Sequence, residues 1–582
     1  MAVQANETKH GNIAVLSTAQ KEIENELLPP PPQALRRWRA PALAAAALLG
    51  APLAWGACVD TAVQGKADGG STCTATGSAY TNNQDTLLAE TGGQLTVSNS
   101  VTFNAGGTMS PGRGIVRAEG TGSKIGFSGD VTLPHGSSHD SHGLLANAGG
   151  QISVSGTTNV QFLPGGIGSD RYAVSARGAD SQITLGAVSL TIPLGALYYT
   201  GLATRSGGKI TYTTAAINGQ GYVAGIKLEG DGEVIGGDTT VNISAPGYGI
   251  GVESAGLVHI NGTLNVISDD LVHGLATSDD GQIHVGANSK IQGVQGIGVL
   301  ISGNKATPLV AGDGLQINYT GTGSTAFDAS NTAAASTTLA NATVTAETLW
   351  WASSSDYTFN AQGGTYTGKS IGSSLTLNMS SAAVWNLNDD SDLKTLELTG
   401  NAALKLDTSH TLTAHDAAGV KNTSGIIDLK DATPATGDVL TIAGNYAGGG
   451  KLRLDVNLAS GGGGAIGVDA DALKVTGNVT GSTQIQVTAL PGAGIATTGN
   501  GILVAEVSGT SPANAFTLAA PVISGGLQYT LHQVGNRWYL QSSPYTGANV
   551  ASVPTLSHLG LLLTGGLLAG AAARARRRQK KA

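Results

Sequence analysis

Gly143-Leu144-Leu145-Ala146-Asn147 is the stretch that decides the fold of this chain. It consists of a small residue, two apolar positions separated by one residue, and a polar turn. The same phrase occurs eight times between residues 114 and 301, at steps of 24 to 30 residues. A fixed period of this size is typical of a solenoid, in which each repeat packs on its neighbours. The eight copies begin at Gly114, Gly143, Ala173, Gly201, Gly225, Gly249, Gly274 and Gly298.

Most periods contain two further apolar strings. In the same unit these are Gln151-Ile152-Ser153-Val154 and Val160-Gln161-Phe162. Alternation of apolar and polar residues is the pattern of a strand with one buried face, and the Gly, Asn, Asp and Ser residues between the strings are typical of tight turns. One coil of three short strands cannot bury its apolar face alone, whereas stacked coils can. The sequence therefore predicts an all-β chain folded as a parallel β-helix with three short strands per coil.

The composition agrees with this fold and limits the function. The chain has 86 glycines, and only 12% of its residues are charged. The net charge of the whole chain is −8; because residues 1–57 contribute +1 and residues 553–582 contribute +6, the middle of the chain carries −15. An acidic solenoid has no electrostatic attraction for nucleic acid. Its long surface favours binding before catalysis.

The repeats are expected to cover residues 92–375. Their step shortens from about 29 to about 24 residues, so the first three coils carry longer turns, and those turns are the first place to look for a binding surface. Beyond residue 310 the period becomes indistinct, which predicts looser coils with insertions.

Residues 1–57 are predicted to be a signal peptide with a long leader. Basic residues precede an apolar run over 40–54, which forms the signal helix, and Gly56 and Ala57 follow as the cleavage region. This order is typical of a secretion signal, and the run is short for a membrane span. A retained N-terminal anchor is the alternative. The basic residues are Arg36, Arg37 and Arg39.

Cys58 and Cys73 are the only cysteines, and both lie just after the cleavage region. In an exported chain a disulfide that closes this small loop is expected, within an N-terminal cap over residues 58–91. The alternative is lipidation of Cys58. That signal usually has Leu three residues before the cysteine, and here Trp55 occupies the position.

The C-terminal 30 residues form a second signal after a polar linker over 544–552. The phrase starting at Val553 is followed by an apolar run over 559–573 and a basic tail. Motif, apolar helix and arginine cluster in this order resemble the bacterial C-terminal sorting signals of the Ile-Pro-Thr-Leu type. Val553 replaces the usual Ile, and His558-Leu559 replaces the usual pair ending in Trp. The residues that carry the resemblance are Val553, Pro554, Thr555, Leu556, Ser557, Gly560, Arg574, Arg576, Arg577 and Arg578.

This resemblance implies that residues 553–582 form a transient transmembrane sorting helix with its basic tail on the cytoplasmic side. It also implies cleavage by a signal-processing membrane protease and delivery to the cell surface. An ordinary tail anchor in the inner membrane is the alternative.

Residues 376–543 contain a series of phrases of a different kind. They include Ala383-Val384-Trp385-Asn386-Leu387, Leu440-Thr441-Ile442-Ala443-Gly444-Asn445-Tyr446 and Arg537-Trp538-Tyr539-Leu540. Their order resembles the pertactin-like passenger domains of Gram-negative autotransporters, including the autochaperone segment at the passenger's end. The resemblance implies a right-handed parallel β-helix, an extracellular or outer-membrane location, and adhesion. We expect Trp385 and Trp538 to pack in the terminal cap.

The resemblance has one large departure. About 40 residues follow Leu540, too few for the membrane barrel that ends an autotransporter. We therefore expect the sorting signal to take the barrel's place and export to depend on other proteins.

One cluster has the composition of a metal site: His135, His139, Asp140 and His142, for zinc or copper. The alternative, which we favour, is a solvated polar turn, so no metal is predicted there. Asn388-Asp389-Asp390-Ser391-Asp392 suggests calcium but lacks a bidentate Glu at loop spacing, and we interpret it as a turn.

Two motif matches overlap at residues 363–372. They have the letters of a phosphate loop and of a nucleophile elbow, but an alternating strand follows where both motifs require a helix. We interpret them as chance matches. Arg117, Arg177 and Arg205 lie at about the same position in their coils, as the basic residues of a polysaccharide lyase would.

These observations predict a non-catalytic protein without a cofactor, an adhesin or surface-contact protein exported by a Gram-negative bacterium. Its expected partners are the export machinery, the processing protease, and ligands on host cells, matrix or bacterial surfaces. The alternative is a glycan-active lyase or hydrolase on the same scaffold.

Overall fold

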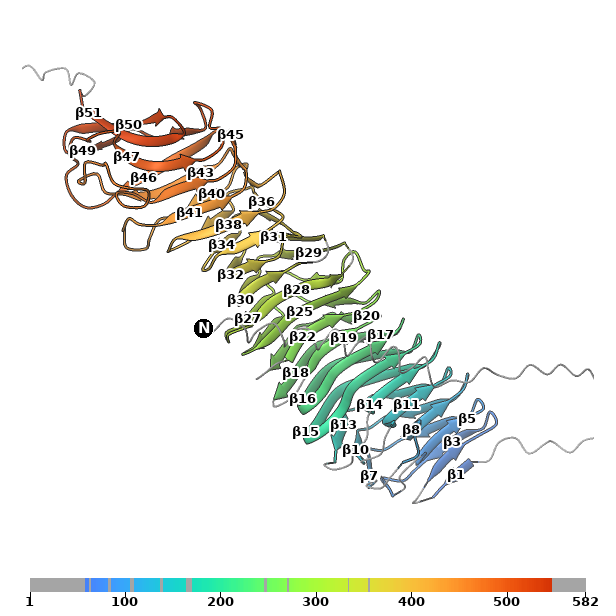
Figure 1. Cartoon of the computed structure of the whole chain (residues 1–582). Helices are drawn as coiled ribbons and strands as arrows, with labels where there is room; N and C mark the ends of the chain where they lie inside the picture. Colours follow the sequence, from blue (N-terminus) through green and yellow to red (C-terminus); the bar gives the residue numbers. More distant parts are fainter. Residues whose placement is uncertain are drawn as a thin grey trace, which may run out of the picture. The chain divides into compact units, whose positions relative to one another are not determined.

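The computed structural model describes residues 58–546, except 62–63, 82–84, 105–108, 137–139, 164–169, 245–248, 269–271, 333 and 354–355. The described residues form strands from β1 to β51 and contain no helix. Figure 1 shows these strands following one another along a single stack from β1 to β51. Strands that follow in sequence lie on different faces of a coil, and strands three apart pair side by side across most of the stack.

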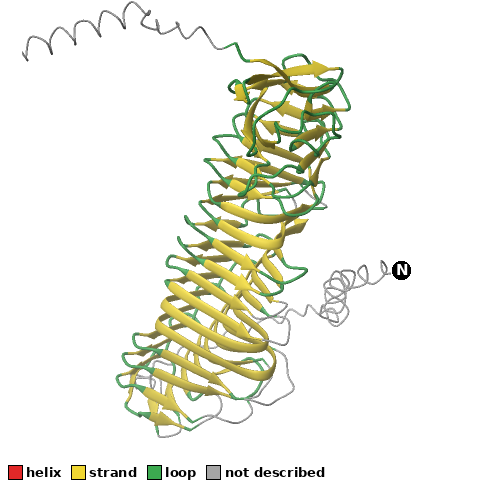
Figure 2. Cartoon of the chain, turned by 90° about the vertical axis from the view of Figure 1, so that its left-hand side faces the viewer, coloured by secondary structure: helices red, strands yellow, loops and turns green. Residues whose placement is uncertain are grey.

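Each coil contributes one strand to each of three faces, and the coil-to-coil pairing on all three is parallel. Figure 2 shows the strands stacked across the coils, with the loops at the corners. The first face contains residues 199–205 of β15 (Gln182–Arg205), residues 223–229 of β16 (Lys209–Glu229), the ends of β30 (Thr343–Trp351) and β32 (Thr365–Ile371), and β2 (Gly65–Ala67), β5 (Leu87–Glu90), β8 (Arg113–Glu119), β11 (Ser141–Asn147), β14 (Arg171–Arg177), β19 (Ile250–Ser254), β22 (Val272–Thr277), β25 (Gly296–Gly303), β28 (Thr325–Thr332), β35 (Ser391–Leu393), β38 (His410–Ala414), β41 (Val439–Ala443), β44 (Ala472–Val475) and β47 (Ile502–Val507).

The second face contains the starts of β15 and β16 together with β3 (Thr72–Ala75), β6 (Gln94–Val97), β9 (Lys124–Phe127), β12 (Gln151–Val154), β17 (Glu233–Gly236), β20 (Leu257–Ile260), β23 (Gln282–Val285), β26 (Leu309–Ala311), β29 (Ala335–Ala340), β31 (Tyr357–Gln362), β33 (Leu375–Ser380), β36 (Thr395–Leu398), β39 (Val420–Asn422), β42 (Tyr446–Gly448) and β45 (Val479–Gly481).

The third face contains the middle parts of β15 and β16, the starts of β30 and β32, and β4 (Ala79–Tyr80), β7 (Val101–Phe103), β10 (Val131–His135), β13 (Thr158–Phe162), β18 (Asp238–Ser244), β21 (Leu264–Ser268), β24 (Lys290–Gly293), β27 (Gln316–Tyr319), β34 (Val384–Asn386), β37 (Ala403–Lys405), β40 (Ile426–Asp428), β43 (Lys451–Val456), β46 (Thr483–Ala489) and β48 (Phe516–Leu518).

The core is a set of apolar columns inside the stack. On the second face one register position is occupied by an aliphatic residue in successive coils, and the side chains in this column are buried. Because equivalent residues of parallel strands lie directly over one another, the sequence repeat becomes a continuous apolar column. The column contains Ile125, Ile152, Ile183, Ile210, Val234, Val258, Ile283 and Leu309.

Glycine pairs at the corner between the first and second faces allow neighbouring coils to approach. Gly149 has a φ of 90°, in the left-handed region. A Cβ added to Gly150 would lie 2.1 Å from the carbonyl oxygen of Ala118 in the preceding coil. Neither position tolerates a larger residue without a backbone shift, which explains why the phrases end in small residues.

The structure does not show the looser coils expected beyond residue 310. Parallel pairing on the third face continues, and the step falls to 19 residues between Thr365 and its partner Val384. Trp350 and Trp385 are fully buried there, with ring centroids 5.4 Å apart. Trp385 therefore belongs to the core in the middle of the stack, which corrects its expected place in the cap. Aromatic side chains fill these short coils, and this packing cannot be seen in the glycine-phrase repeat.

The two ends of the stack are closed by antiparallel strands. β1 (Cys58–Asp60) pairs with β2, and a disulfide joins Cys58 to Cys73 of β3, with 5.7 Å between their Cα atoms. At the other end β51 (Arg537–Pro544) pairs with β47 and with β50 (Leu527–Val534), which pairs with β49 (Val522–Ser524). Trp538 on β51 packs edge-on against Phe516 at 5.5 Å, so this tryptophan does lie in the cap.

The fold prediction is confirmed for the described residues: they are all-β and form a parallel β-helix with three strands per coil. Within these residues no helix is long and apolar enough to cross a membrane. The predicted signal helix and the sorting helix at residues 559–573 lie outside the described residues.

A candidate binding groove on the third face

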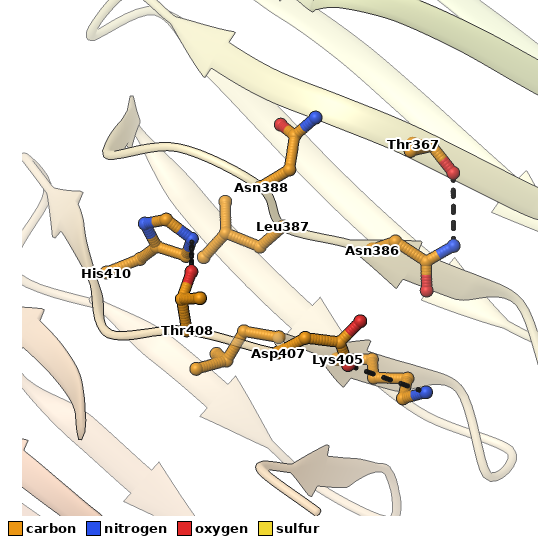
Figure 3. Close-up of a pocket in the computed structure, with 9 residues that line it drawn as sticks. Thr367, Asn386, Leu387, Asn388, Lys405, Asp407, Thr408 and His410 are labelled. Carbon is orange, nitrogen blue, oxygen red and sulfur yellow. Dashed lines mark hydrogen bonds and ion pairs between the residues drawn. The ribbon is translucent and has the colours of Figure 1, made fainter. Parts of the chain in front are cut away.

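Three neighbouring coils form a polar groove where their third-face strands end. Thr367 of β32, Asn386 of β34 and Lys405 of β37 occupy the same register position in successive coils. The chain segments that follow β34 and β37 complete the groove, whose volume is about 400 Å³. Figure 3 shows the side chains of both segments beside this register column. The lining consists of Thr367, Asn386, Leu387, Asn388, Lys405, Leu406, Asp407, Thr408 and His410.

The groove follows from the alternation of side chains at the strand ends. Leu387 and Leu406, which come directly after β34 and β37, are buried and hold the two segments against the core. The next residues, Asn388 and Asp407, therefore face away from the core. Because the coil step here is only 19 residues, the two segments are short and lie one coil apart.

Several groove side chains hold one another in place. Asn386 donates from Nδ2 to Oγ1 of Thr367 at 3.0 Å, and Thr408 is hydrogen-bonded through Oγ1 to Nε2 of His410 at 2.8 Å. Lys405 lies 3.7 Å from Asp407, whose side chain is 74% exposed. Dashed lines in Figure 3 mark these interactions. The groove thus presents amide, hydroxyl, ammonium and carboxylate groups, which are suited to binding a polar ligand through hydrogen bonds.

The acidic stretch at residues 388–392 forms the rim of this groove and uses its own carboxylates. Asp389 accepts a hydrogen bond from Lys369 at 2.9 Å, which lowers the pKa of Asp389 and raises that of Lys369. Asp390 accepts from the backbone of Thr411 at 2.7 Å, and Asp392 accepts from the backbone of Gly372 at 2.6 Å. This agrees with the interpretation as a turn. The Asp392 bond, with two from Ser370, also bridges β32 and β35, which are not paired by a strand ladder.

The two chance motif matches lie on a strand. Lys369 and Ser370 are both part of β32. Ser370 is 1% exposed and donates from Oγ to the carbonyl oxygen of Asp392 at 2.9 Å. A serine in this position is not available as a nucleophile, and no loop at the start of a helix is present there to hold a phosphate.

The histidine cluster is buried where a solvated turn was expected. His135 and His142 have no exposed side-chain surface, and burial lowers their pKa values to about 4 and about 3. His142 stacks on Tyr172 with ring centroids 4.9 Å apart, and its Nε2 lies 3.6 Å from Asp140. His139 lies outside the described residues. Among the residues that the structure does describe, no group of three or more potential ligands is placed to hold a metal ion.

The three arginines do not share one register position. Arg177 and Arg205 are aligned, but Arg117 lies two residues earlier, in register with Leu145 and Ser175. The sequence comparison missed this offset because the phrase tolerates either alignment.

Each of these arginines is also held in an ion pair. Arg117 contacts Asp85 at 2.6 Å, Arg177 contacts Asp140 at 2.7 Å, and Arg205 contacts Glu229 at 2.5 Å. They therefore do not form a row of free cations that would bind an acidic polysaccharide.

Two of the predicted sites cannot be placed. The cleavage region at Gly56 and Ala57 and the sorting signal from Val553 onward lie outside the described residues. The groove, by contrast, was not predicted from the sequence, because its residues come from three coils and carry no motif.

Comparisons with known proteins place two segments. Residues 415–531, which begin just beyond the groove, match the family described as Autochaperone Domain Type 1, and residues 551–578 match the IPTL-CTERM motif. The chain is autotransporter-passenger-like and carries an IPTL-type C-terminal signal. It is an exported protein of a Gram-negative bacterium, at the cell surface or in the outer membrane. The predicted resemblance and location are thereby confirmed.

Curated relatives match part of this passenger-like chain. "Probable autotransporter YfaL" of Escherichia coli (strain K12) is 37% identical over 133 residues, which are 22% of the chain and 10% of the relative. "Uncharacterized protein YdeU" of the same organism is 36% identical over 122 residues, which are 20% of the chain and 25% of the relative. The chain thus spans a quarter or less of the length of either relative.

Among solved structures, the Haemophilus influenzae Hap adhesin matches with 13% identity and a TM-score of 0.29. The match covers 82% of this chain and 64% of that one.

Proposed function

We propose that the chain is a non-catalytic surface-contact protein of the adhesin type, which is displayed by means of its C-terminal signal. The observation that carries the proposal is the uninterrupted β-helix, which ends in an autochaperone-type segment and is followed by an IPTL-type signal. A β-helix between two export-related segments presents a long side surface to the outside of the cell.

The charge arrangement along the coils supports a binding role over catalysis. The arginines that would serve a lyase are neutralised in ion pairs. In the groove, His410 Nδ1 lies 3.9 Å from Asp390, while its Nε2 is hydrogen-bonded to Thr408. No described groove residue combines a nucleophile with a general base at hydrogen-bond distance, as covalent catalysis requires. Polar groups at a turn-built groove are instead typical of ligand contact.

The proposed sorting step involves partners outside the chain. Export machinery would deliver the passenger, and a membrane protease would act at the signal that begins with Val553. Fractionation of cells that produce the full chain tests this step. In the variant Pro554→Ala, or with Arg574, Arg576, Arg577 and Arg578 replaced by Gln, we expect loss of surface display and retention in the inner membrane. Unchanged display would overturn the sorting proposal.

Binding is tested by adding cells that display the chain to immobilised host cells, matrix polymers and bacterial surfaces. We expect retention on at least one of these surfaces, and a several-fold loss for the double variant Asn388→Ala/Asp407→Ala. Asp280→Ala, which changes another exposed aspartate on a distant turn, is the matched control. Cleavage of a polysaccharide by the purified chain would refute the non-catalytic part of the proposal.

A further inference from the structure

Three aspartates meet at one corner of the stack, in the coils after the groove. Asp438 and Asp471 directly precede β41 and β44, whose first residues pair as Val439 and Ala472. The two aspartates therefore lie one above the other in neighbouring coils. Asp455 is near the end of β43, and the bridge between Val456 and Ala470 brings it beside Asp471.

Hydrogen bonds from the backbone fix Asp471 in this corner. Its Oδ1 accepts from the N–H groups of Gly437 and Asp438 at 3.1 and 3.2 Å, and its Oδ2 accepts from the N–H of Asp455 at 2.7 Å. Asp455 Oδ2 accepts from the N–H of Asp431 at 3.1 Å. One carboxylate thus joins two successive coils, so its environment affects the closure of both.

Two carboxylate oxygens in the same corner have no partner. Asp455 is 0% exposed and Asp471 is 1% exposed. Oδ1 of Asp455 and Oδ2 of Asp438 are buried and accept no hydrogen bond from any described residue. A buried carboxylate oxygen without a donor is costly when ionised, and adding a proton removes that cost.

We propose that Asp438, Asp455 and Asp471 form a proton-binding site, and that a proton bound there stabilises the corner between the coils of β40–β41 and β43–β44. The ligand is a proton rather than a metal ion, since no group of three or more ligands in the described part of the chain is placed to hold a metal. The proposal is independent of what the groove binds.

The charges that face this corner also favour protonation. Asp431 and Asp407 add negative charge at Asp438, and Lys430 is the cation that acts on Asp455. Burial, followed by these neighbouring carboxylates, raises the pKa of Asp438 to about 6. Burial also raises the pKa of Asp471 to about 7 against the effect of its backbone donors, and the pKa of Asp455 is raised in the same way.

The direction of the pH effect follows from linkage. Because the folded pKa values lie above the usual 3.8, the folded state binds more protons than the unfolded state between about pH 4 and pH 7. The stabilisation is therefore fully present at the acidic end of this window and is lost as the pH rises through the folded values. Three coupled carboxyl groups titrate as a unit rather than one by one.

Hydrogen–deuterium exchange of the full chain, corrected for the intrinsic pH dependence of exchange, provides a local test. In peptides covering residues 426–475 we expect protection to rise about tenfold for each bound proton between pH 8 and pH 5. Asp438→Asn and Asp455→Asn should each reduce the slope and raise the protection at pH 8. Asp469→Asn, in the same loop but bonded to the backbone of Gly464, is the control and should retain the slope.

The outcomes against the proposal are distinct. A wild-type protection that does not change with pH, or a slope that survives in both Asn variants, would overturn it. Protection induced at pH 8 by millimolar calcium would overturn it in favour of a cation site. If the variants do not fold, infrared spectra of the wild-type chain decide, since a protonated carboxyl band must persist well above pH 4 and its absence refutes the site.

Discussion

The coils of β8–β16 and those of β40–β44 use buried charge in opposite ways on the same scaffold. In the N-terminal coils each partly buried carboxylate meets an arginine of another coil, as in the pairs Asp85–Arg117 and Asp140–Arg177. In the C-terminal coils Asp438 and Asp471 meet each other. The parallel ladder aligns whichever residues share a register position. The sequence at the corner therefore decides whether a coil junction is an ion pair or a proton site.

The N-terminal arrangement also includes rings that are absent from the C-terminal corner. Tyr172 is flanked by His142 and by the guanidinium groups of Arg177 and Arg205, at 5.2 and 5.1 Å from its ring centroid. Cations over an aromatic face are favourable when partly desolvated. These coils therefore hold their cations by two kinds of contact, whereas the aspartate corner depends on backbone donors and protonation.

The largest expected effect is on the buried N-terminal pair. Arg117→Ala leaves Asp85 without its closest cation, and we expect the local stability of β5–β11 to fall by about 3–5 kcal/mol. Arg113→Ala is the matched control, since Arg113 contacts the same carboxylate at 2.9 Å but its side chain is 42% exposed, and a loss below about 1 kcal/mol is expected. Hydrogen exchange measures both. Equal losses in the two variants would show that burial is not the deciding factor.

The second effect is a pH response of opposite sign at the two corners. His135 and His142 are neutral in the folded chain, with pKa values of about 4 and about 3, because they are buried. Their stabilisation is present above pH 6.5 and is lost as the pH falls toward the folded values, by about 2 kcal/mol for each histidine at pH 5. Lowering the pH from 7 to 5 should therefore loosen β10–β14 while it protects residues 426–475. The same direction of change at both corners would contradict the comparison.

Much of the stack could be predicted from local patterns. The phrases at Gly143 and Gln151 identify strands because apolar alternation depends on neighbouring residues alone. Partners across coils depend on the number of residues per coil, which varies from 19 to 33 within the third face. For that reason Arg117 was assigned the register of Arg177, and Trp385 was expected at the cap.

The aspartate corner could not have been found from the sequence. Asp455 and Asp471 are 16 residues apart on a glycine-rich loop, and only the bridge at Val456 shows that the loop folds back. The disulfide partners were predictable because the chain has two cysteines, and the fold of the autochaperone-type segment was predictable because its phrases are distinctive.

A third effect concerns the N-terminal closure. Cys58→Ala/Cys73→Ala removes the disulfide that ties β1 to β3, and we expect a loss of about 2–4 kcal/mol for the first coil. The loss should be confined to β1–β7, because each coil contacts only its neighbours. Exchange of the same chain under reducing and oxidising conditions measures it. A loss that spreads to the groove would mean that the stack unfolds as one unit.

The smallest effect connects the groove to the aspartate corner. Asp407 lines the groove and is one of the charges that raise the pKa of Asp438. Replacing it in Asp407→Asn should move the pH midpoint of protection at residues 426–475 downward by a fraction of a pH unit, because Asp407 is exposed and its field is screened by salt. The shift should shrink as ionic strength rises. By the same linkage, a cationic ligand in the groove would lower the proton affinity of the corner. A midpoint that is unchanged at low salt would show that groove and corner are electrostatically separate.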